Sequence, residues 1–273
     1  MTLLFLSICA DAPFAQKMNA EDILAKHLDS IGSAKSRESV KTRIIISDAE
    51  FLQQKQNPVK GKFMVASSTD GAVFGINLDA ANYRLDTFSY DGKKVRVGYI
   101  QPGIRSFLGA FILSYDTVLK EGLIGGTLSS SWALLNVEGR KAKVSYDGTE
   151  KIDGNETYAL EFIPKGGSDI TIRMFFDTKN FRHVRTVYSR VIGARIGSGG
   201  VNSSASQVET RYKLVENFSD FKKFGELTLP SSYVIDYNIT GGAANVNYLW
   251  KFKVTDASFN QPLGDAAFDI DAN

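Results

Sequence analysis

The chain has 273 residues, of which 43% are hydrophobic and 23% are charged, and these values exclude a disordered or fibrous protein. Its 32 basic and 30 acidic residues nearly cancel, so it lacks the net positive charge that would hold a nucleic-acid backbone. We therefore expect a globular protein with no nucleic-acid partner.

An apolar run, TLLFLSICA, covers residues 2–10 near the start of the chain. A helix that spans a bilayer needs about 20 such residues, so this run is too short to be one. The small residues after it, Ala10-Asp11-Ala12 and Ala15, fit the pattern that a signal peptidase cleaves. We predict a signal peptide at 1–16, a single mature domain at 17–273 and export to the periplasm.

Two further features of this run bear on that prediction. No lysine or arginine precedes it, so an alternative is that it forms the first turn of a helix. It also contains Cys9, the sole cysteine, whose removal with the signal peptide would leave a chain without disulfides. A lipoprotein signal needs a small residue before the cysteine, whereas Ile8 stands there, so we do not expect lipid anchoring at Cys9.

A single amphipathic helix is predicted to follow. Asn19 can cap its start, and Gly32 can end it in a left-handed conformation. His27 lies beside the apolar stripe on its polar boundary, and His183, the only other histidine, is far away in sequence, so we expect no metal site. The apolar residues fall on one stripe at helical spacing: Ile23, Leu24, Leu28 and Ile31.

From Val40 onward the apolar residues recur with a period of two, which is typical of strands with one buried face. Asp-Gly pairs suited to hairpin turns separate several of these segments, at 91–92, 147–148 and 153–154. We therefore predict an antiparallel meander with one dry face and one wet face. The stretch Gly193 to Ser206 is predicted to be a flexible loop, and it lacks the spacing of a dinucleotide-binding fingerprint.

The segment from Ile104 to Asn136 differs from the strands around it, since it is apolar, rich in glycine and helical in period. If residues 104–119 form a helix, seven side chains share one face: Phe107, Leu108, Phe111, Ile112, Tyr115, Val118 and Leu119. A sheet with one dry face needs such a cover, so one interpretation is that the segment is ordinary core.

The second interpretation of this segment is a movable lid over an apolar pocket. Gly109 would destabilise a helix by about 1 kcal/mol relative to alanine, whereas glycines there and at 122, 125 and 126 would permit hinge rotation. A second short helix, capped by Ser130 or Ser131 and starting at Trp132, would move with the first.

Three features together resemble the LolA-like outer-membrane lipoprotein carriers and sorting proteins. They are the helix AEDILAKHLDSIG (20–32), the long antiparallel meander with an apolar helical interruption, and the closing FNQPLGDAAF (259–268). The resemblance implies a mainly β fold with helices (α+β), namely an antiparallel, strongly curved half-open β-barrel with an N-terminal helix and an apolar helical lid on its concave side.

The same resemblance implies a function. It implies a periplasmic, monomeric carrier that holds the acyl chains of a lipid or acylated lipoprotein and exchanges them with a membrane-bound donor or acceptor protein. The carriers use an arginine in the cavity to control closing, and no residue of this sequence is assigned that role. An acyl chain gains about 0.8 kcal/mol per methylene removed from water, so such a pocket would need no cofactor.

We predict that the pocket wall combines lid residues with inward-facing strand residues. A register error of one residue would turn the strand members outward. From this assignment, Phe111→Asp or Trp132→Asp should abolish lipid co-purification and leave the β signal in circular dichroism intact. The predicted pocket and lid residues are Phe107, Leu108, Phe111, Ile112, Tyr115, Trp132, Leu135, Phe162, Tyr212, Tyr233, Trp250 and Phe252.

Covalent chemistry is not indicated by the residue types. The chain has no G-x-S-x-G elbow and no cluster of residues at metal-ligand spacing, and Asp147 and Asp153 are expected at solvated turns. We therefore expect no enzyme activity and no cofactor. Two alternatives remain, a scaffold or envelope-stress sensing domain that binds a protein, and a secreted hydrolase whose carboxylates converge from distant strands.

Overall fold

The computed structural model describes residues 18–53, 56–193, 209–241, 245–264 and 266–270. The predicted signal peptide lies outside these described residues, as does all but the first residue of the predicted loop at 193–206.

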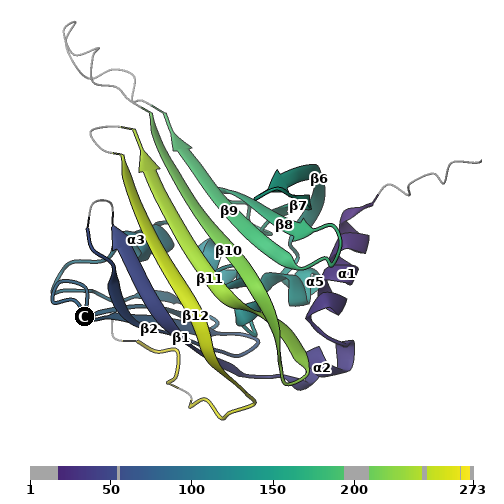
Figure 1. The fold of residues 1–273 in the computed structure, drawn as a ribbon, viewed down its shortest axis with the longest axis horizontal. Coiled ribbons are helices and arrows are strands. Elements are labelled where there is room, and N and C mark those ends of the chain that lie inside the picture. The colour runs from purple at the N-terminus through teal and green to yellow at the C-terminus, as the bar shows by residue number, and fades with distance from the viewer. Residues whose placement is uncertain (1–17, 54–55, 194–208, 242–244, 265, 271–273) are drawn as a thin grey trace, which may run out of the picture.

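The fold is one antiparallel sheet of twelve strands within the described residues, in the order β5-β4-β3-β2-β1-β12-β11-β10-β9-β8-β7-β6. Figure 1 shows it as a continuous curved layer, with α3 and α5 behind the front strands and α1 at one side. The strands are β1 (Arg43–Gln53), β2 (Val59–Ser67), β3 (Ala72–Leu78), β4 (Leu85–Tyr90), β5 (Val95–Val97), β6 (Lys143–Ile152), β7 (Asn155–Ile163), β8 (Thr171–Asp177), β9 (His183–Ile192), β10 (Thr210–Phe224), β11 (Leu227–Thr240) and β12 (Val246–Phe259).

The helices lie before the first strand and between β5 and β6. They are α1 (Ala20–Ile31), α2 (Ala34–Ser39), α3 (Phe107–Ser114), α4 (Thr117–Lys120), the 3₁₀ turns η1 (Gly126–Leu128) and η2 (Ala133–Asn136), and α5 (Val137–Arg140). The predicted fold class, a curved and open antiparallel barrel with an N-terminal helix and helices on one face, is confirmed.

The topology explains why an apolar helical segment stands in the middle of the sequence. Two meanders, β1 to β5 and β6 to β12, are joined where β1 pairs with β12, with Arg43 opposite Phe259 and Phe51 opposite Trp250. This pairing leaves β5 and β6 as the two edges of the sheet. Because the chain must pass from one edge to the other, the residues between them cross the open side, where α3 packs on β4 and β5 and η1 packs on β11.

The N-terminal helix begins as predicted but ends differently. The Asn19 side chain accepts a hydrogen bond from the Asp22 backbone N–H at 2.7 Å, which confirms the cap. Gly32 has φ 158° and ψ 173°, so the predicted left-handed end is wrong. A Cβ at Gly32 would lie 3.1 Å from the Glu226 carbonyl oxygen, so close approach of the turn between β10 and β11 favours glycine there.

Two of the three predicted Asp-Gly turns are confirmed. Residues 91–92 connect β4 to β5, and residues 153–154 connect β6 to β7. The prediction for 147–148 is wrong, because these residues lie inside β6, where the register shifts between Tyr146 and Thr149. A bulge can use a glycine with positive φ just as a turn can, and Gly148 has φ 91°.

The helix predicted over residues 104–119 is divided in the structure. α3 ends at Ser114, Tyr115 and Asp116 interrupt it, and α4 covers Thr117–Lys120. The second predicted helix is the 3₁₀ turn η2, which follows Trp132 without a side-chain cap, so the capping role predicted for Ser130 or Ser131 is wrong. Ser131 instead bonds Ser129, since the Ser131 N–H donates to Ser129 Oγ at 3.1 Å.

Candidate functional site

The segment from Ser106 to Asn136, which we call the lid, packs most of its apolar side chains onto the concave face of the sheet. In the state described they belong to the core, so the space directly beneath the lid is largely occupied by its own side chains. Eleven of them are less than 4% exposed: Leu108, Phe111, Ile112, Val118, Leu119, Leu123, Ile124, Leu128, Trp132, Ala133 and Leu134.

The twelve predicted site residues divide into three groups by their surroundings. Phe107 is 52% exposed on the outer side of α3. Three residues are partly buried at the border of the core: Tyr115, Leu135 and Tyr212. The other eight are buried, and the strand members among them do face inward: Leu108, Phe111, Ile112, Trp132, Phe162, Tyr233, Trp250 and Phe252.

An apolar pocket of about 190 Å³, which we call the rim pocket, opens where the lid begins. Phe107 covers it, with its ring stacked on the Tyr248 ring at a centroid distance of 4.6 Å. Of the predicted site residues, the rim pocket brings together Phe107 and Trp250. Its lining consists of Phe51, Gln53, Gln56, Val59, Ala80, Asn82, Tyr83, Ile100, Ile104, Arg105, Ser106, Phe107, Tyr248 and Trp250.

A chain of hydrogen bonds supports the wall of the rim pocket. Trp250 Nε1 donates to Tyr83 Oη at 3.1 Å, and Tyr83 Oη donates to Asp86 Oδ2 at 2.9 Å. The Ser106 hydroxyl donates to the same Asp86 oxygen at 2.5 Å and accepts from the Gly109 N–H at 2.8 Å. Burial raises the pKa of Asp86, whereas the bonds from Ser106 and Tyr83 act in the opposite direction. This network fixes the first turn of α3 to β4.

A buried glutamate ties the middle of the lid to the sheet. Glu216 on β10 accepts hydrogen bonds from the Gly125 N–H at 2.7 Å, from Tyr233 Oη at 2.5 Å and from Tyr188 Oη at 2.6 Å. Complete burial raises the pKa of Glu216 from 4.5 to about 7, against the lowering effect of these three bonds. Sequence reasoning missed this residue.

A buried arginine holds the next part of the lid. Arg43, at the start of β1, donates from Nη1 to the carbonyl oxygens of Thr127 and Ser129, the second at 3.3 Å. Burial lowers the pKa of Arg43 to about 10. Beside it, the Ser130 N–H donates to Ser67 Oγ at 2.8 Å. Strand side chains therefore form hydrogen bonds with several backbone groups of the lid.

The two histidines, which are far apart in sequence, lie close together in the core. The prediction that His27 stands on a polar boundary is wrong, because it is buried with its ring 6.1 Å from the ring of His183. His27 Nε2 accepts from Trp132 Nε1 at 3.3 Å, so its Nδ1 carries the proton and donates to the Phe181 carbonyl at 3.0 Å. Burial lowers the pKa of His27 to about 4 and that of His183 well below its usual value, so both rings stay neutral.

The glycines of the lid have a structural explanation that does not require a hinge. Gly122, Gly125 and Gly126 adopt φ values of 66°, 77° and 50°, which favour glycine. A Cβ on Gly122 would lie 1.9 Å from the Ser131 carbonyl oxygen, and one on Gly109 would lie 2.9 Å from a side chain of β5. The glycine content therefore reflects close packing and left-handed backbone, and it is no evidence for movement.

Gly122→Ala is expected to lower the free energy of unfolding by more than about 2 kcal/mol, because the methyl group meets a backbone carbonyl as well as a strained φ. The matched control is Gly103→Ala, since Gly103 has a similar φ of 74° but no atom within 4 Å of its Cβ position. Gly103→Ala should lower the free energy of unfolding by less, about 1 kcal/mol. Urea unfolding measures both, and equal losses would contradict the role of the close contact.

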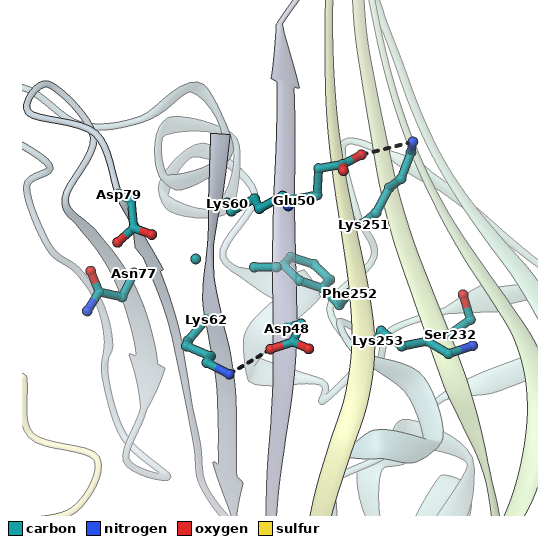
Figure 2. Close-up of a pocket in the computed structure, with 12 residues that line it drawn as sticks. Asp48, Glu50, Lys60, Lys62, Asn77, Asp79, Ser232, Lys251, Phe252 and Lys253 are labelled. Carbon is teal, nitrogen blue, oxygen red and sulfur yellow. Dashed lines mark hydrogen bonds and ion pairs between the residues drawn. The ribbon is translucent and has the colours of Figure 1, made fainter. Parts of the chain in front are cut away.

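A larger groove of about 730 Å³ lies on the solvent face of β1, β2 and β12 and is lined mainly by charged side chains. Figure 2 shows Lys62 paired with Asp48 and Lys251 paired with Glu50, at 2.6 Å and 3.2 Å. Its acids and bases nearly balance, and exposed pairs of this kind are typical of a solvated surface. We therefore place the candidate site at the rim pocket and the lid.

A search of solved structures finds proteins that are similar to this chain over most of its length. A LolA superfamily protein from Nitrosomonas europaea is 15% identical, with a TM-score of 0.52 over 92% of this chain and 97% of that chain. A putative outer membrane lipoprotein-sorting protein domain from Vibrio parahaemolyticus is 13% identical, with a TM-score of 0.46 over 92% and 97%. A DUF1329 family protein from Desulfovibrio piger is 11% identical, with a TM-score of 0.42 over 91% and 96%.

The match to the Nitrosomonas europaea protein confirms the resemblance at the level of the fold. No family model matches the sequence, and no curated protein matches it. In the part of the chain that the structure describes, no helix is long and apolar enough to cross a membrane.

Proposed function

We propose that the chain, from about residue 17 onward, is a periplasmic carrier that binds an acyl chain of a lipid or lipoprotein and performs no covalent chemistry. The observation that carries the proposal is the apolar rim pocket at the start of a lid that polar side chains fasten to the sheet. The LolA fold, and a solved structural neighbour named as a lipoprotein-sorting domain, support the same class of function.

In this proposal the structure described is the closed state. An acyl chain enters at the rim pocket, beneath Phe107, and the lid moves away from the sheet to admit more of it. The buried apolar side chains of the lid and of the strands then contact the acyl chain instead of one another. Each methylene of the acyl chain that is buried contributes about 0.8 kcal/mol to the free energy of binding. Lid movement breaks the bonds to Arg43 and Glu216, so these two residues set the free energy of opening.

The site offers no set of groups for hydrolysis. Asp86 and Glu216 accept hydrogen bonds from neighbouring hydroxyl groups and lie under the lid, where they support its backbone. We therefore propose binding without reaction. A protein partner, as expected of a sensing or scaffold domain, is the competing outcome of the experiment below.

Native mass spectrometry of the protein purified from the cell envelope tests the proposal. We expect it to retain an acylated molecule, and a stoichiometric protein partner without lipid would instead favour the sensing domain. Phe111→Asp and Trp132→Asp are poor probes, because both residues are buried and a buried carboxylate would unfold the chain.

Phe107→Asp is the sharper variant, since Phe107 is half exposed and covers the pocket without belonging to the core. We expect it to lose most of the acylated ligand while its melting temperature changes little. The control is Leu85→Asp, because Leu85 is 49% exposed and does not line the pocket. Equal retention of ligand by both variants would contradict the pocket assignment.

A further inference from the structure

One cation stands at the mouth of the rim pocket. Arg105 is the only charged side chain among the described residues that line it. Its guanidinium lies over the Tyr99 ring, 4.0 Å from the centroid, and its Nε donates to the Val97 carbonyl oxygen at 3.3 Å. These two contacts fix the orientation of the guanidinium and do not use its terminal nitrogens.

The charge of Arg105 is not neutralised by a neighbour within the described part of the chain. Two other partly buried arginines do have carboxylate partners: Arg96 pairs with Asp91 at 2.6 Å, and Arg173 pairs with Asp147 at 2.6 Å. None of the described pocket residues is acidic. A partly buried guanidinium next to an apolar space is therefore complementary to an anionic group that enters from solution.

The size of the rim pocket limits what can carry that group. A volume of about 190 Å³ is below the ~300 Å³ at which pockets for drug-sized ligands begin, so it suits one narrow chain rather than several. Phe107, Tyr248 and Trp250 give it aromatic walls, which bind methylene groups without demanding hydrogen bonds. Polar head and apolar chain would then lie within one site.

We propose that the rim pocket binds a free fatty acid, with its carboxylate on the terminal nitrogens of Arg105 and part of its chain beneath Phe107. One guanidinium matches one carboxylate through two parallel N–H···O bonds, which favours this head group over a phosphate that would need further cations. The inference rests on the proposed carrier function and narrows its ligand to a single-chain anion.

The test compares two ligands of equal chain length on the delipidated full chain, laurate and the uncharged dodecanol, by isothermal titration calorimetry. The parent protein should bind laurate at least about tenfold more tightly than dodecanol, as expected for one charge-assisted bidentate pair. High salt should reduce this preference, because the guanidinium is partly exposed to solvent.

Arg105→Met should remove the preference for laurate and leave dodecanol binding unchanged, so dodecanol binding also reports that the variant is folded. Arg105→Lys keeps the charge without the fork geometry and should lose roughly threefold in laurate affinity. The control is Arg211→Met, because Arg211 carries an exposed guanidinium that pairs with Glu209 and does not line the pocket. This substitution should change neither affinity.

The fatty-acid assignment and the proposed carrier function would be contradicted by different outcomes. If the parent binds both ligands equally, or if Arg105→Met binds laurate normally, the fatty-acid assignment is wrong while dodecanol binding still supports the carrier. If the parent binds neither ligand and retains no acylated molecule from the cell envelope, the proposed function fails and this inference fails with it.

Discussion

Replacing Glu216 with glutamine is expected to stabilise the protein increasingly as the pH rises from about 4 to about 8. Burial raises the pKa of Glu216 from 4.5 to about 7, so the folded protein binds its proton more tightly than the unfolded chain does. The stability that the protonated carboxyl contributes is fully present below about pH 4.5 and is lost as the pH passes through about 7. The difference between the two pKa values corresponds to about 3 kcal/mol.

Glutamine keeps the shape of the protonated carboxyl and cannot ionise, so it escapes this loss. Any constant difference between the two side chains shifts the whole curve, and only the pH-dependent part reports the ionisation. Urea unfolding of parent and variant at several pH values measures it, with Glu156→Gln, an exposed glutamate, as the baseline for loss of a surface carboxylate. A free-energy difference that stays flat with pH would show that Glu216 is not desolvated in solution.

The comparison with a variant is necessary because the buried histidines affect stability in the opposite direction to Glu216 over the same pH range. Burial lowers the pKa of His27 from 6.5 to about 4, so the stability contributed by its neutral ring is present above about pH 6.5 and is lost as the pH falls. His183 acts in the same direction. The parent alone would therefore show a partly cancelled profile, whereas the difference between variant and parent isolates the glutamate.

The ionisation of Glu216 also bears on the lid. The ionised carboxylate can accept all three of its hydrogen bonds at once, including the one from the Gly125 N–H. A protonated carboxyl must donate one bond, so the hydroxyl of Tyr188 or Tyr233 has to turn and accept it. Proton uptake therefore changes the fastening of the lid while it stabilises the fold.

Local periodicity was sufficient to predict most of the strands and the first helix, whereas the curved half-open barrel was expected from the resemblance to the LolA-like proteins. The Asn19 cap, the helix after it and the alternating strands all follow from side-chain spacing along one segment. β1 and β12 are the paired strands that lie farthest apart in the sequence, and no local pattern specifies the register of their pairing. Similarly, periodicity gives the apolar face of the lid but says nothing about how much space lies beneath it.

The buried polar residues were missed although a signal was present. Glu216 has the same parity on its strand as Tyr212, which the sequence analysis places in the pocket wall, so alternation alone places a carboxylate inside. His27 lies four residues from both Ile23 and Ile31, at the centre of the stripe rather than at its border. A charged or imidazole side chain at an inward position is informative because it needs a partner across the core. Its partner is what the sequence does not reveal.

Replacing Arg43 with methionine is expected to loosen the lid selectively. The substitution leaves the Thr127 and Ser129 carbonyl oxygens without their charged donor, and a hydrogen bond to a charged group contributes about 1.5–3 kcal/mol. Methionine is apolar and similar in length, so it keeps the packing around the site while removing the bonds. A loss of about 3 kcal/mol would raise the population of the open lid roughly a hundredfold.

Hydrogen exchange measures this loosening residue by residue. Backbone amides at 122–136 should exchange roughly a hundredfold faster in Arg43→Met, whereas amides of β8 should change little, because no bond of Arg43 reaches that strand. Arg185→Met is the matched control, since it removes a mostly buried guanidinium that bonds Asn217 and Asp153 rather than the lid. If both variants speed exchange equally across the sheet, Arg43 stabilises the whole fold and does not fasten the lid. Faster uptake of dodecanol by Arg43→Met alone would connect the opening of the lid to the entry of an acyl chain.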